Sequence, residues 1–397
     1  MNNPQAQIPP IWIGVAIALY AFIAIGIAEG GFGVLLPSIL STYDLTPATV
    51  TLLFVSQVSG YMVAAFTSSL VSSRLGLARM LLFAATALAT ALLIYALTVH
   101  WWLMVAAGTL LGLGVGLIDA GINTYIVQNQ RSAHLIGLLH AFYGIGALLG
   151  PAVATTLLAF ELNWRQVYLI FAGVVSLLIA GVGGAIAIRY GPMTLRVPTA
   201  NTTALGNLQR SLKTPVVLLS GLILFVYVGT EVSIGNWAYT VQSVARKTPE
   251  LIAGYSISAY WLGLTLGRFS LGYCLQRLGA TRSISFSLGL LLIGLLGWWL
   301  LPDQWLSLPL IGFALAAIFP TIIWLIPRRL TETLVPAAVG FITSMASLGA
   351  AIIPTMVGWL ASGAGLEIIP PLMLPLALLM VGLHRLLIRA DRLSNNL

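Results

Sequence analysis

The sequence predicts an all-α membrane protein with twelve transmembrane helices in two pseudo-symmetric six-helix bundles. Its 397 residues are 59% hydrophobic and only 7% charged, whereas a soluble domain carries about 25% charged residues. Apolar runs recur along the chain, and each is close to the roughly 20 residues that cross a bilayer core as a helix. We therefore interpret the net charge of +8 as membrane topology and expect no nucleic-acid partner.

Charged residues and Pro- or Gly-rich breaks separate twelve apolar segments. These segments lie near 11–38, 46–72, 80–99, 102–127, 134–159, 167–188, 215–243, 252–275, 284–301, 306–327, 337–361 and 368–388. The longest polar interval, 189–214, divides them six and six. We expect an N-terminal bundle over 1–188, a linker over 189–214, and a C-terminal bundle with a short tail over 215–397.

Lysine and arginine are distributed unevenly between the two ends of these segments. With a cytoplasmic N-terminus, fourteen of the eighteen basic residues lie on the cytoplasmic side, as the positive-inside rule requires. The start, MNNPQAQIPP, lacks the cationic region of a signal peptide, so we expect it to be retained. The sequence thus predicts a multi-pass protein of a bacterial inner membrane with both termini cytoplasmic.

The two halves of the chain repeat each other at an almost constant offset. Glu29 recurs as Glu231 at an offset of 202. An offset of 203 relates SRLG (73–76) to QRLG (276–279), and Gly137, Gly146 and Pro151 to Gly340, Gly349 and Pro354. Parallel repeats around a site near the bilayer midplane are a transporter architecture.

Three of the ten acidic residues, Glu29, Asp119 and Glu231, lie inside apolar segments. A charge at a helix centre costs about 2.5–3.5 kcal/mol on insertion scales, so such residues face the bundle interior or a water-filled cavity. Burial favours the neutral form of a carboxyl group, and an acid that changes its charge can couple a cation to a conformational change. The alternative is a structural acid that neighbouring polar groups satisfy.

The neighbours of Asp119 favour a functional role. Gly112, Gly116 and Asn123 share its helix face at spacings of three and four residues. Asn123 adds a donor and an acceptor, although the glycines fit simple helix packing as well. Glu29 and Asp119 lie at different depths along their helices, so we expect them to act from opposite sides of one site without a direct hydrogen bond.

Helix 215–243 gathers an acid, an amide and aromatic rings around Glu231. This combination suits a sugar, because rings stack on apolar sugar faces while polar groups bind hydroxyls; aromatic residues near a span end also serve as interface anchors. The predicted substrate-binding residues are Gln57, Asn123, His140, Tyr143, Asn236, Trp237, Tyr260 and Trp324.

A further set of residues is predicted to have structural or gating roles. Arg268, within segment 252–275, either snorkels or pairs with Glu231. The complete set is Arg74, Gly76, Gly150, Pro151, Arg268, Arg277, Gly279 and Pro354.

Over its whole length the chain resembles the major facilitator superfamily. The family's loop signature, G-x-x-x-D-R-x-G, survives as Ser69, Ser73, Arg74 and Gly76, and in the second half as Gly272, Gln276, Arg277 and Gly279. Because serine and glutamine occupy the acidic position, the family's charge latch between halves is weakened.

Four stretches, GVGLIDAGINTYIV, LLHAFYGIGALLGP, YVGTEVSIGNW and AAIFPT, resemble the fucose-permease branch of that family. There, acids on the first and fourth helices carry proton and substrate coupling, and the resemblance assigns these roles to Glu29 and Asp119. It implies a secondary active transporter for symport of a sugar or similar small polar solute with a cation. That cation is a proton, with sodium as the alternative.

The competing hypothesis is a proton-coupled exporter of drugs or other small apolar solutes. Gly137, Gly146, Gly150 and Pro151 fit the antiporter pattern G-x8-G-x3-G-P. Much of the same frame recurs in segment 337–361, which fits closely packed helices as well as it fits antiport. The sequence shows no P-loop, metal cluster or nucleophile triad, so we expect no enzyme activity, cofactor or metal, and we expect a monomer.

Overall fold

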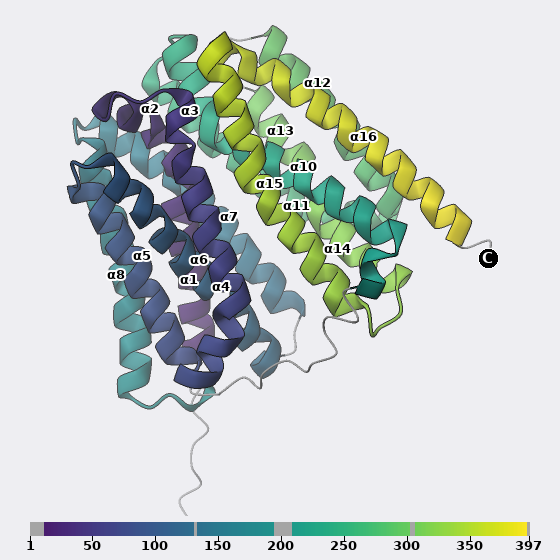
Figure 1. The fold of residues 1–397 in the computed structure, drawn as a ribbon, viewed down its shortest axis with the longest axis horizontal. Coiled ribbons are helices and arrows are strands. Elements are labelled where there is room, and N and C mark those ends of the chain that lie inside the picture. The colour runs from purple at the N-terminus through teal and green to yellow at the C-terminus, as the bar shows by residue number, and fades with distance from the viewer. Residues whose placement is uncertain (1–11, 131–132, 194–208, 302–305, 395–397) are drawn as a thin grey trace, which may run out of the picture.

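The computed structural model describes residues 12–130, 133–193, 209–301 and 306–394. Secondary structure throughout these ranges is helical, with no strand among them. Two groups of helices pack side by side (Figure 1). We call them the N-half (described residues 12–193) and the C-half (described residues 209–394).

The helices follow the apolar segments closely. The N-half contains α1 (Trp12–Gly30), α2 (Phe32–Thr42), α3 (Pro47–Val50), α4 (Leu52–Leu75), α5 (Leu77–Leu97), α6 (Trp101–Gln130), α7 (Ala133–Ala159), α8 (Trp164–Ala187) and the short η1 (Gly191–Met193). The C-half contains α10 (Pro215–Thr240), η2 (Val241–Ala245), α11 (Glu250–Leu278), α12 (Ala280–Leu300), α13 (Ser307–Leu315), α14 (Ile318–Arg329), α15 (Val335–Ala364), η3 (Leu366–Ile368) and α16 (Ile369–Ser394).

Eleven spans in the described chain are long and apolar enough to cross a membrane. The twelfth helix of the fold is α11, whose 29 residues extend for about 43 Å at 1.5 Å per residue. It is less apolar because it carries Glu250, Arg268 and Arg277. The chain is therefore a multi-pass integral membrane protein with the predicted all-α fold.

The 203-residue repeat corresponds to the same helix contacts in both halves. A Cβ atom on Gly146 of α7 would lie 2.3 Å from the carbonyl oxygen of Ile23 in α1. A Cβ atom on Gly349 of α15 would lie 2.0 Å from the carbonyl oxygen of Phe225 in α10. Neither backbone can move aside, so both helix pairs need glycine for this close approach.

The helix pairs α4–α6 and α11–α13 show the same correspondence. A Cβ atom on Gly112 would lie 1.8 Å from the carbonyl oxygen of Gln57, and one on Gly312 would lie 2.0 Å from that of Tyr260. Gln57 and Tyr260 are themselves 203 positions apart. The two halves are thus built on one packing scheme, which positions the helices that carry the polar residues.

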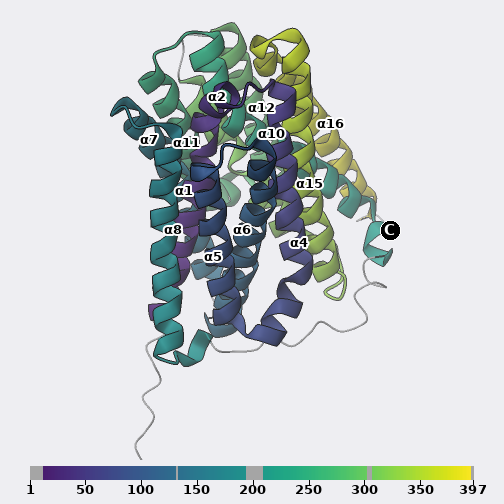
Figure 2. The same cartoon turned by 60° about the vertical axis from the view of Figure 1, so that its left-hand side comes forward.

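The two halves contact each other at one end of the molecule. We call the end at which α8 stops and α10 begins the linker end, and the opposite one the far end. At the far end α2 packs against α10, α3 and α4 against α15, and α7 against α11. Figures 1 and 2 show the halves converging there and diverging toward the linker end.

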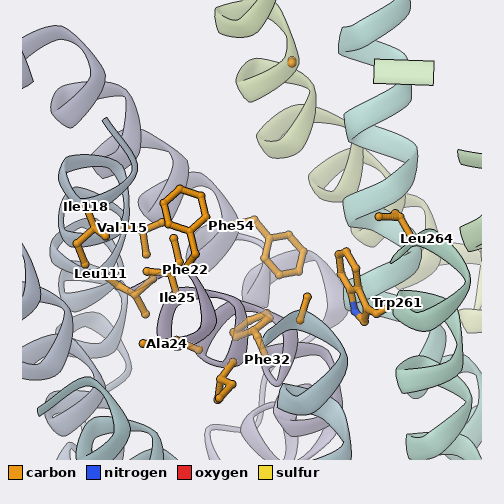
Figure 3. Packing of buried hydrophobic residues seen from close by; sticks show 14 of the residues in the cluster. Phe22, Ala24, Ile25, Phe32, Phe54, Leu111, Val115, Ile118, Trp261 and Leu264 are labelled. Carbon is orange, nitrogen blue, oxygen red and sulfur yellow. The ribbon is translucent and has the colours of Figure 1, made fainter. Parts of the chain in front are cut away.

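Aromatic side chains line the contact between the halves. The rings of Phe32 and Phe54 lie 5.7 Å apart, and Phe54 also packs edge-on against Trp237 of α10 at 5.8 Å. Figure 3 shows Phe32 and Phe54 on the side of the N-half that faces Trp261 of α11. The hydroxyls of Thr156 and Tyr255 lie 2.9 Å apart at the far end. This contact closes the far end in the present conformation.

Candidate transport site

Asp119, in the middle of α6, has hydrogen-bond donors on both carboxyl oxygens. The Tyr61 hydroxyl of α4 donates to Oδ2 at 2.7 Å. The Asn123 amide donates to Oδ1 at 2.8 Å and to the Asp119 carbonyl oxygen at 2.9 Å. Gly116 permits this arrangement, because a Cβ atom there would lie 3.0 Å from the Tyr61 carbonyl oxygen. These neutral donors stabilise the charged carboxylate and leave its charge uncompensated, so a cation or proton can neutralise it.

Glu29 lies at the end of α1, just before the helix breaks at Gly31. The Tyr143 hydroxyl of α7 donates to its Oε2 at 3.0 Å. Gly26 brings the two helices together, since a Cβ atom there would lie 2.5 Å from the Tyr143 carbonyl oxygen. Glu29 and Asp119 interact electrostatically, but the hydrogen bonds described for them come from different partners.

Glu231 of α10 is compensated by a positive charge. Arg268 of α11 attracts it electrostatically, and Tyr227 of α10 is a neighbour of both side chains. The Tyr260 hydroxyl donates to the Glu231 carbonyl oxygen at 3.0 Å. Among the described residues the ion pairs within 4.0 Å are elsewhere. Arg268 therefore offsets the charge of Glu231 electrostatically without an ion pair within 4.0 Å.

Two side chains of α7 connect the acids of the N-half with this pair. Tyr143 interacts electrostatically with Glu231 and Arg268 as well as with Glu29. His140, one turn nearer the linker end and exposed, interacts with Asp119 and Arg268. The residues from both halves thus form one central polar cluster, which consists of Glu29, Tyr61, Asp119, Asn123, His140, Tyr143, Tyr227, Glu231, Tyr260 and Arg268.

The cluster lies next to a close contact between α7 and α11, which is nearer the linker end than their contacts at Thr155 and Thr156. A Cβ atom on Gly144 would lie 2.7 Å from the Thr265 hydroxyl, so the two helices nearly touch there. His140 and Arg268 follow about one turn further toward the linker end, where the halves diverge (Figure 1). His140, on the linker-end side of the cluster, is exposed, so solvent reaches the cluster from that side.

Other residues predicted to bind substrate lie outside the cluster. The Gln57 amide donates to the Tyr95 hydroxyl at 3.3 Å, inside the N-half. Trp237 is fully buried, and its indole N–H donates to the Pro354 carbonyl oxygen at 3.2 Å. Trp324 is 43% exposed near the end of α14, with the Arg328 guanidinium 3.4 Å from its ring centroid. The contacts described for these three residues do not include the acids.

Asn236 is half-buried at the contact between the halves. A Cβ atom on Gly33 of α2 would lie 3.2 Å from its Cα atom. Its role in binding substrate, like those of Gln57, Trp237 and Trp324, stays a prediction.

Tyr61 is a residue of the cluster that the sequence did not single out. A lone tyrosine in the segment QVSGYMVAA resembles any other aromatic residue of an apolar span. The available signal is indirect: Gly60 beside it and Gly112 and Gly116 on α6 are the small residues that bring α4 against Asp119.

The predicted gating residues lie mainly at loops and helix contacts. Gly76 and Gly279 adopt φ values of 81° and 74°, which a side chain rarely tolerates. Each is the single residue between two consecutive helices, α4–α5 and α11–α12. Arg74 and Arg277, two residues before them, are exposed. Their gating role stays a prediction.

The predicted glycine and prolines of α7 and α15 lie within those helices. A Cβ atom on Gly150 would lie 2.6 Å from the Ile27 carbonyl oxygen of α1. Pro151 and Pro354 lie inside the continuous helices α7 and α15, at equivalent positions of the repeat.

Residues 18–354 match the family model of the Major Facilitator Superfamily. The chain belongs to this superfamily. It is 25% identical to the glucose/mannose transporter GlcP of Bacillus subtilis over 356 residues, which cover 85% of each chain. It is 23% identical to Bypass of stop codon protein 6 of Saccharomyces cerevisiae over 91% of this chain and 80% of the relative.

Solved structures of this superfamily have the same fold. The nucleoside transporter NupG has a TM-score of 0.74 at 16% identity, over 96% of this chain and 98% of that one. A D-xylose-proton symporter has a TM-score of 0.71 at 18% identity, over 93% of this chain and 97% of that one. The protein is therefore a membrane transporter of the major facilitator fold, and not an enzyme.

Proposed function

We propose that this transporter moves a sugar or similar small polar solute together with a cation, in the first instance a proton. The observation that carries the proposal is Asp119, held by Tyr61 and Asn123 without a positive partner. Similarity to a glucose/mannose transporter and to the fold of a D-xylose-proton symporter supports the substrate class and the coupling ion.

The coupling follows from the electrostatics of a carboxylate inside a membrane protein. A charged Asp119 needs water, a cation or polar groups around it, whereas a protonated one does not. Its charge state therefore favours one arrangement of the halves over the other. Glu29, held by Tyr143, is a second acid of the same kind, and the electrostatic interaction between the two makes neutralisation of one favour ionisation of the other.

The substrate would lie between the halves, among the groups that both contribute. Asn123 and His140 offer hydrogen-bonding groups from the N-half, and Glu231 and Tyr260 offer them from the C-half. Sugar hydroxyls both donate and accept, so they can satisfy carboxylates, amides and phenols in one site. Because it contacts both halves, such a substrate would favour closure around itself.

The orientation that we propose places the linker 189–214 and both termini in the cytoplasm of a bacterial inner-membrane protein. The excess of basic residues at the linker end supports it. The present conformation would then be closed to the outside. Labelling of an Arg196→Cys variant tests this topology: modification by an impermeant reagent added outside intact cells would contradict it. Arg196 lies outside the described residues.

The exporter alternative is less well supported, because its glycines have a structural explanation. Gly146 and Gly150 bring α7 against α1. Gly349 makes the equivalent contact between α15 and α10. A pattern that serves packing in both halves gives no specific evidence for antiport.

Uptake by proteoliposomes tests the proposal directly. Purified protein is reconstituted and offered labelled D-glucose, D-mannose, D-xylose and uridine, each with and without an imposed pH or sodium gradient. We expect at least one sugar to accumulate when a cation gradient is directed inward, and an ionophore to abolish that accumulation. Uptake of no sugar under any gradient, or accumulation driven only by an outward cation gradient, would contradict symport of a sugar.

A further inference from the structure

A shallow groove lies between α11 and α12 near the linker end, away from the central polar cluster. Its apolar walls include Leu271, Cys274, Leu278, Phe286, Leu290 and Phe313. Phe286 and Leu278 are 56% and 40% exposed, so the groove opens on the surface of the bundle.

Two of the three serines that line the groove, Ser270 and Ser283, use their hydroxyl protons within the helices. Ser270 donates to the Gly267 carbonyl oxygen at 3.0 Å, and Ser283 donates to the Gly279 carbonyl oxygen at 2.8 Å. Their hydroxyl protons are thus used within the helices, and an apolar chain can lie against them without leaving a donor unpaired.

Two arginines flank the groove at its linker end. Arg277 lies in the last turn of α11, and Arg282 lies in the first turn of α12. Gly279 alone separates the two helices, which keeps the arginines at a similar depth. Both are exposed, and the Arg277 guanidinium lies 5.6 Å from the centroid of the Tyr273 ring. Of the described carboxylates, none lies within 4.0 Å of either one.

The surrounding surface is positively charged. Arg328, Arg385 and Arg389 are also exposed at this end of the C-half. Asp391, an acid at the same end, already pairs with Arg329. Basic pockets between transmembrane helices bind anionic lipid headgroups.

We propose that this groove binds an anionic phospholipid. The phosphate lies between Arg277 and Arg282, and one acyl chain fills the groove between α11 and α12. The phosphate supplies the negative charge that the arginines lack, and the chain covers the exposed apolar wall. A soluble phosphate would satisfy the arginines but leave that wall uncovered.

The N-half contains a matched comparison for this site. Arg74 and Arg79 lie 203 positions before Arg277 and Arg282 and flank Gly76 in the same way. At the equivalent positions the N-half keeps Val71, Leu75 and Phe83, but Ser68 stands where α11 has Leu271, and Ala87 stands where α12 has Leu290. The N-half therefore has the arginine pair beside a smaller apolar wall.

Lipid-dependent stability of the purified full-length protein tests the proposal, independently of any transported substrate. Thermal unfolding in detergent is followed while dioleoyl-phosphatidylglycerol, dioleoyl-phosphatidylcholine or glycerol 3-phosphate is added. We expect a rise in the midpoint with phosphatidylglycerol only. One arginine near an anionic lipid contributes about fivefold in affinity, so Arg277→Gln/Arg282→Gln should weaken the effect about 25-fold.

The control is Arg74→Gln/Arg79→Gln, which removes the same two charges from the other half and should change the affinity less than about twofold. Equal losses in both double variants would overturn the proposal, because they would indicate diffuse attraction. An equal effect of phosphatidylcholine, or full stabilisation by glycerol 3-phosphate, would overturn it as well. If the double variant does not fold, Arg282→Gln alone should show about a fivefold loss, and an unchanged affinity would refute the site.

Discussion

In the N-half, Asp119 and Glu29 accept hydrogen bonds from neutral tyrosine and asparagine side chains, whereas in the C-half Glu231 lies near Arg268. The helices that carry these groups pack in the same way in both halves. Gly112 and Gly312 make matching helix contacts in the two halves. Asp119 lies seven residues after Gly112, on α6, whereas the residue seven positions after Gly312 is Phe319, on α14. The repeat therefore preserves the helix contacts and leaves the polar residues free to diverge. Acids without a positive partner suit ion coupling, and a compensated acid suits ligand binding.

The far ends of the halves show the same divergence. In the N-half, Arg165 donates to the Ala96 carbonyl oxygen at 3.4 Å and to the Tyr43 hydroxyl at 3.4 Å. In the C-half, Arg246 donates to the Trp298 carbonyl oxygen at 2.9 Å and pairs with Glu367 at 3.0 Å. Tyr43 and Arg246 are 203 positions apart. The far end of each half thus has one arginine that joins neighbouring segments. We call these contacts the far-end junctions: Arg165 of α8 forms the one in the N-half, and Arg246, which follows η2, forms the one in the C-half.

The largest effect is expected from the acids of the N-half, and it distinguishes a role in cation coupling from a purely structural role. Asp119→Asn mimics the protonated acid, so the variant should exchange substrate but lose all accumulation driven by a gradient. Glu29→Gln should behave in the same way. Proteoliposome uptake and counterflow measure the two activities, with Glu161→Gln, an exposed acid at the far end, as the control. Accumulation by Asp119→Asn at the wild-type level would show that Asp119 is structural.

The second prediction concerns charge compensation in the C-half. Arg268→Gln leaves Glu231 without its positive neighbour, which should destabilise the fold by about 3 kcal/mol. Glu231→Gln should do the same to Arg268. The double variant should regain part of that loss, because neither charge then stays uncompensated. Thermal unfolding in detergent measures this coupling, and additive losses in the double variant would show that the two charges are independent.

A smaller effect is expected from the tyrosine that holds Asp119. Tyr61→Phe removes a hydrogen bond to a charged acceptor, which contributes about 1.5–3 kcal/mol. The Asp119 carboxylate then loses one of its side-chain donors, so gradient-driven accumulation in proteoliposomes should fall about tenfold while counterflow exchange continues. Tyr20→Phe is the control, since Tyr20 donates to the Val174 carbonyl oxygen instead. Accumulation by Tyr61→Phe at the wild-type level would exclude Tyr61 as a positioning residue.

The smallest effect is expected at the far-end junctions. Glu367 is 54% exposed, so Glu367→Gln should destabilise the C-half by less than about 1 kcal/mol. Tyr43→Phe, which removes an acceptor from Arg165, should have a similarly small effect on the N-half. Thermal unfolding of the two variants compares the junctions. A loss above about 2 kcal/mol in only one of them would show that the junctions are not equivalent.

The helices could be predicted closely because span length and hydropathy are local properties. Segment 134–159, for example, corresponds to α7 (Ala133–Ala159). The pairing of Asp119 with Asn123 also follows from helical spacing. The positions of Tyr61 and Trp237 could not be predicted, because they depend on how α4 meets α6 and on how the halves meet at the far end. Hydropathy does not determine which face of an apolar helix contacts another helix.

The close contact between Gly144 and Thr265 has the geometry of a fulcrum. If the halves rock against each other, as in transporters built from repeats, displacement grows with distance from this point. His140 lies about 6 Å from it along α7, whereas Ala159 at the far end lies about 22 Å away. A given rotation therefore moves the far end about four times as far as it moves the cluster. The acids can stay within electrostatic reach of Arg268 while the ends of the helices swing apart.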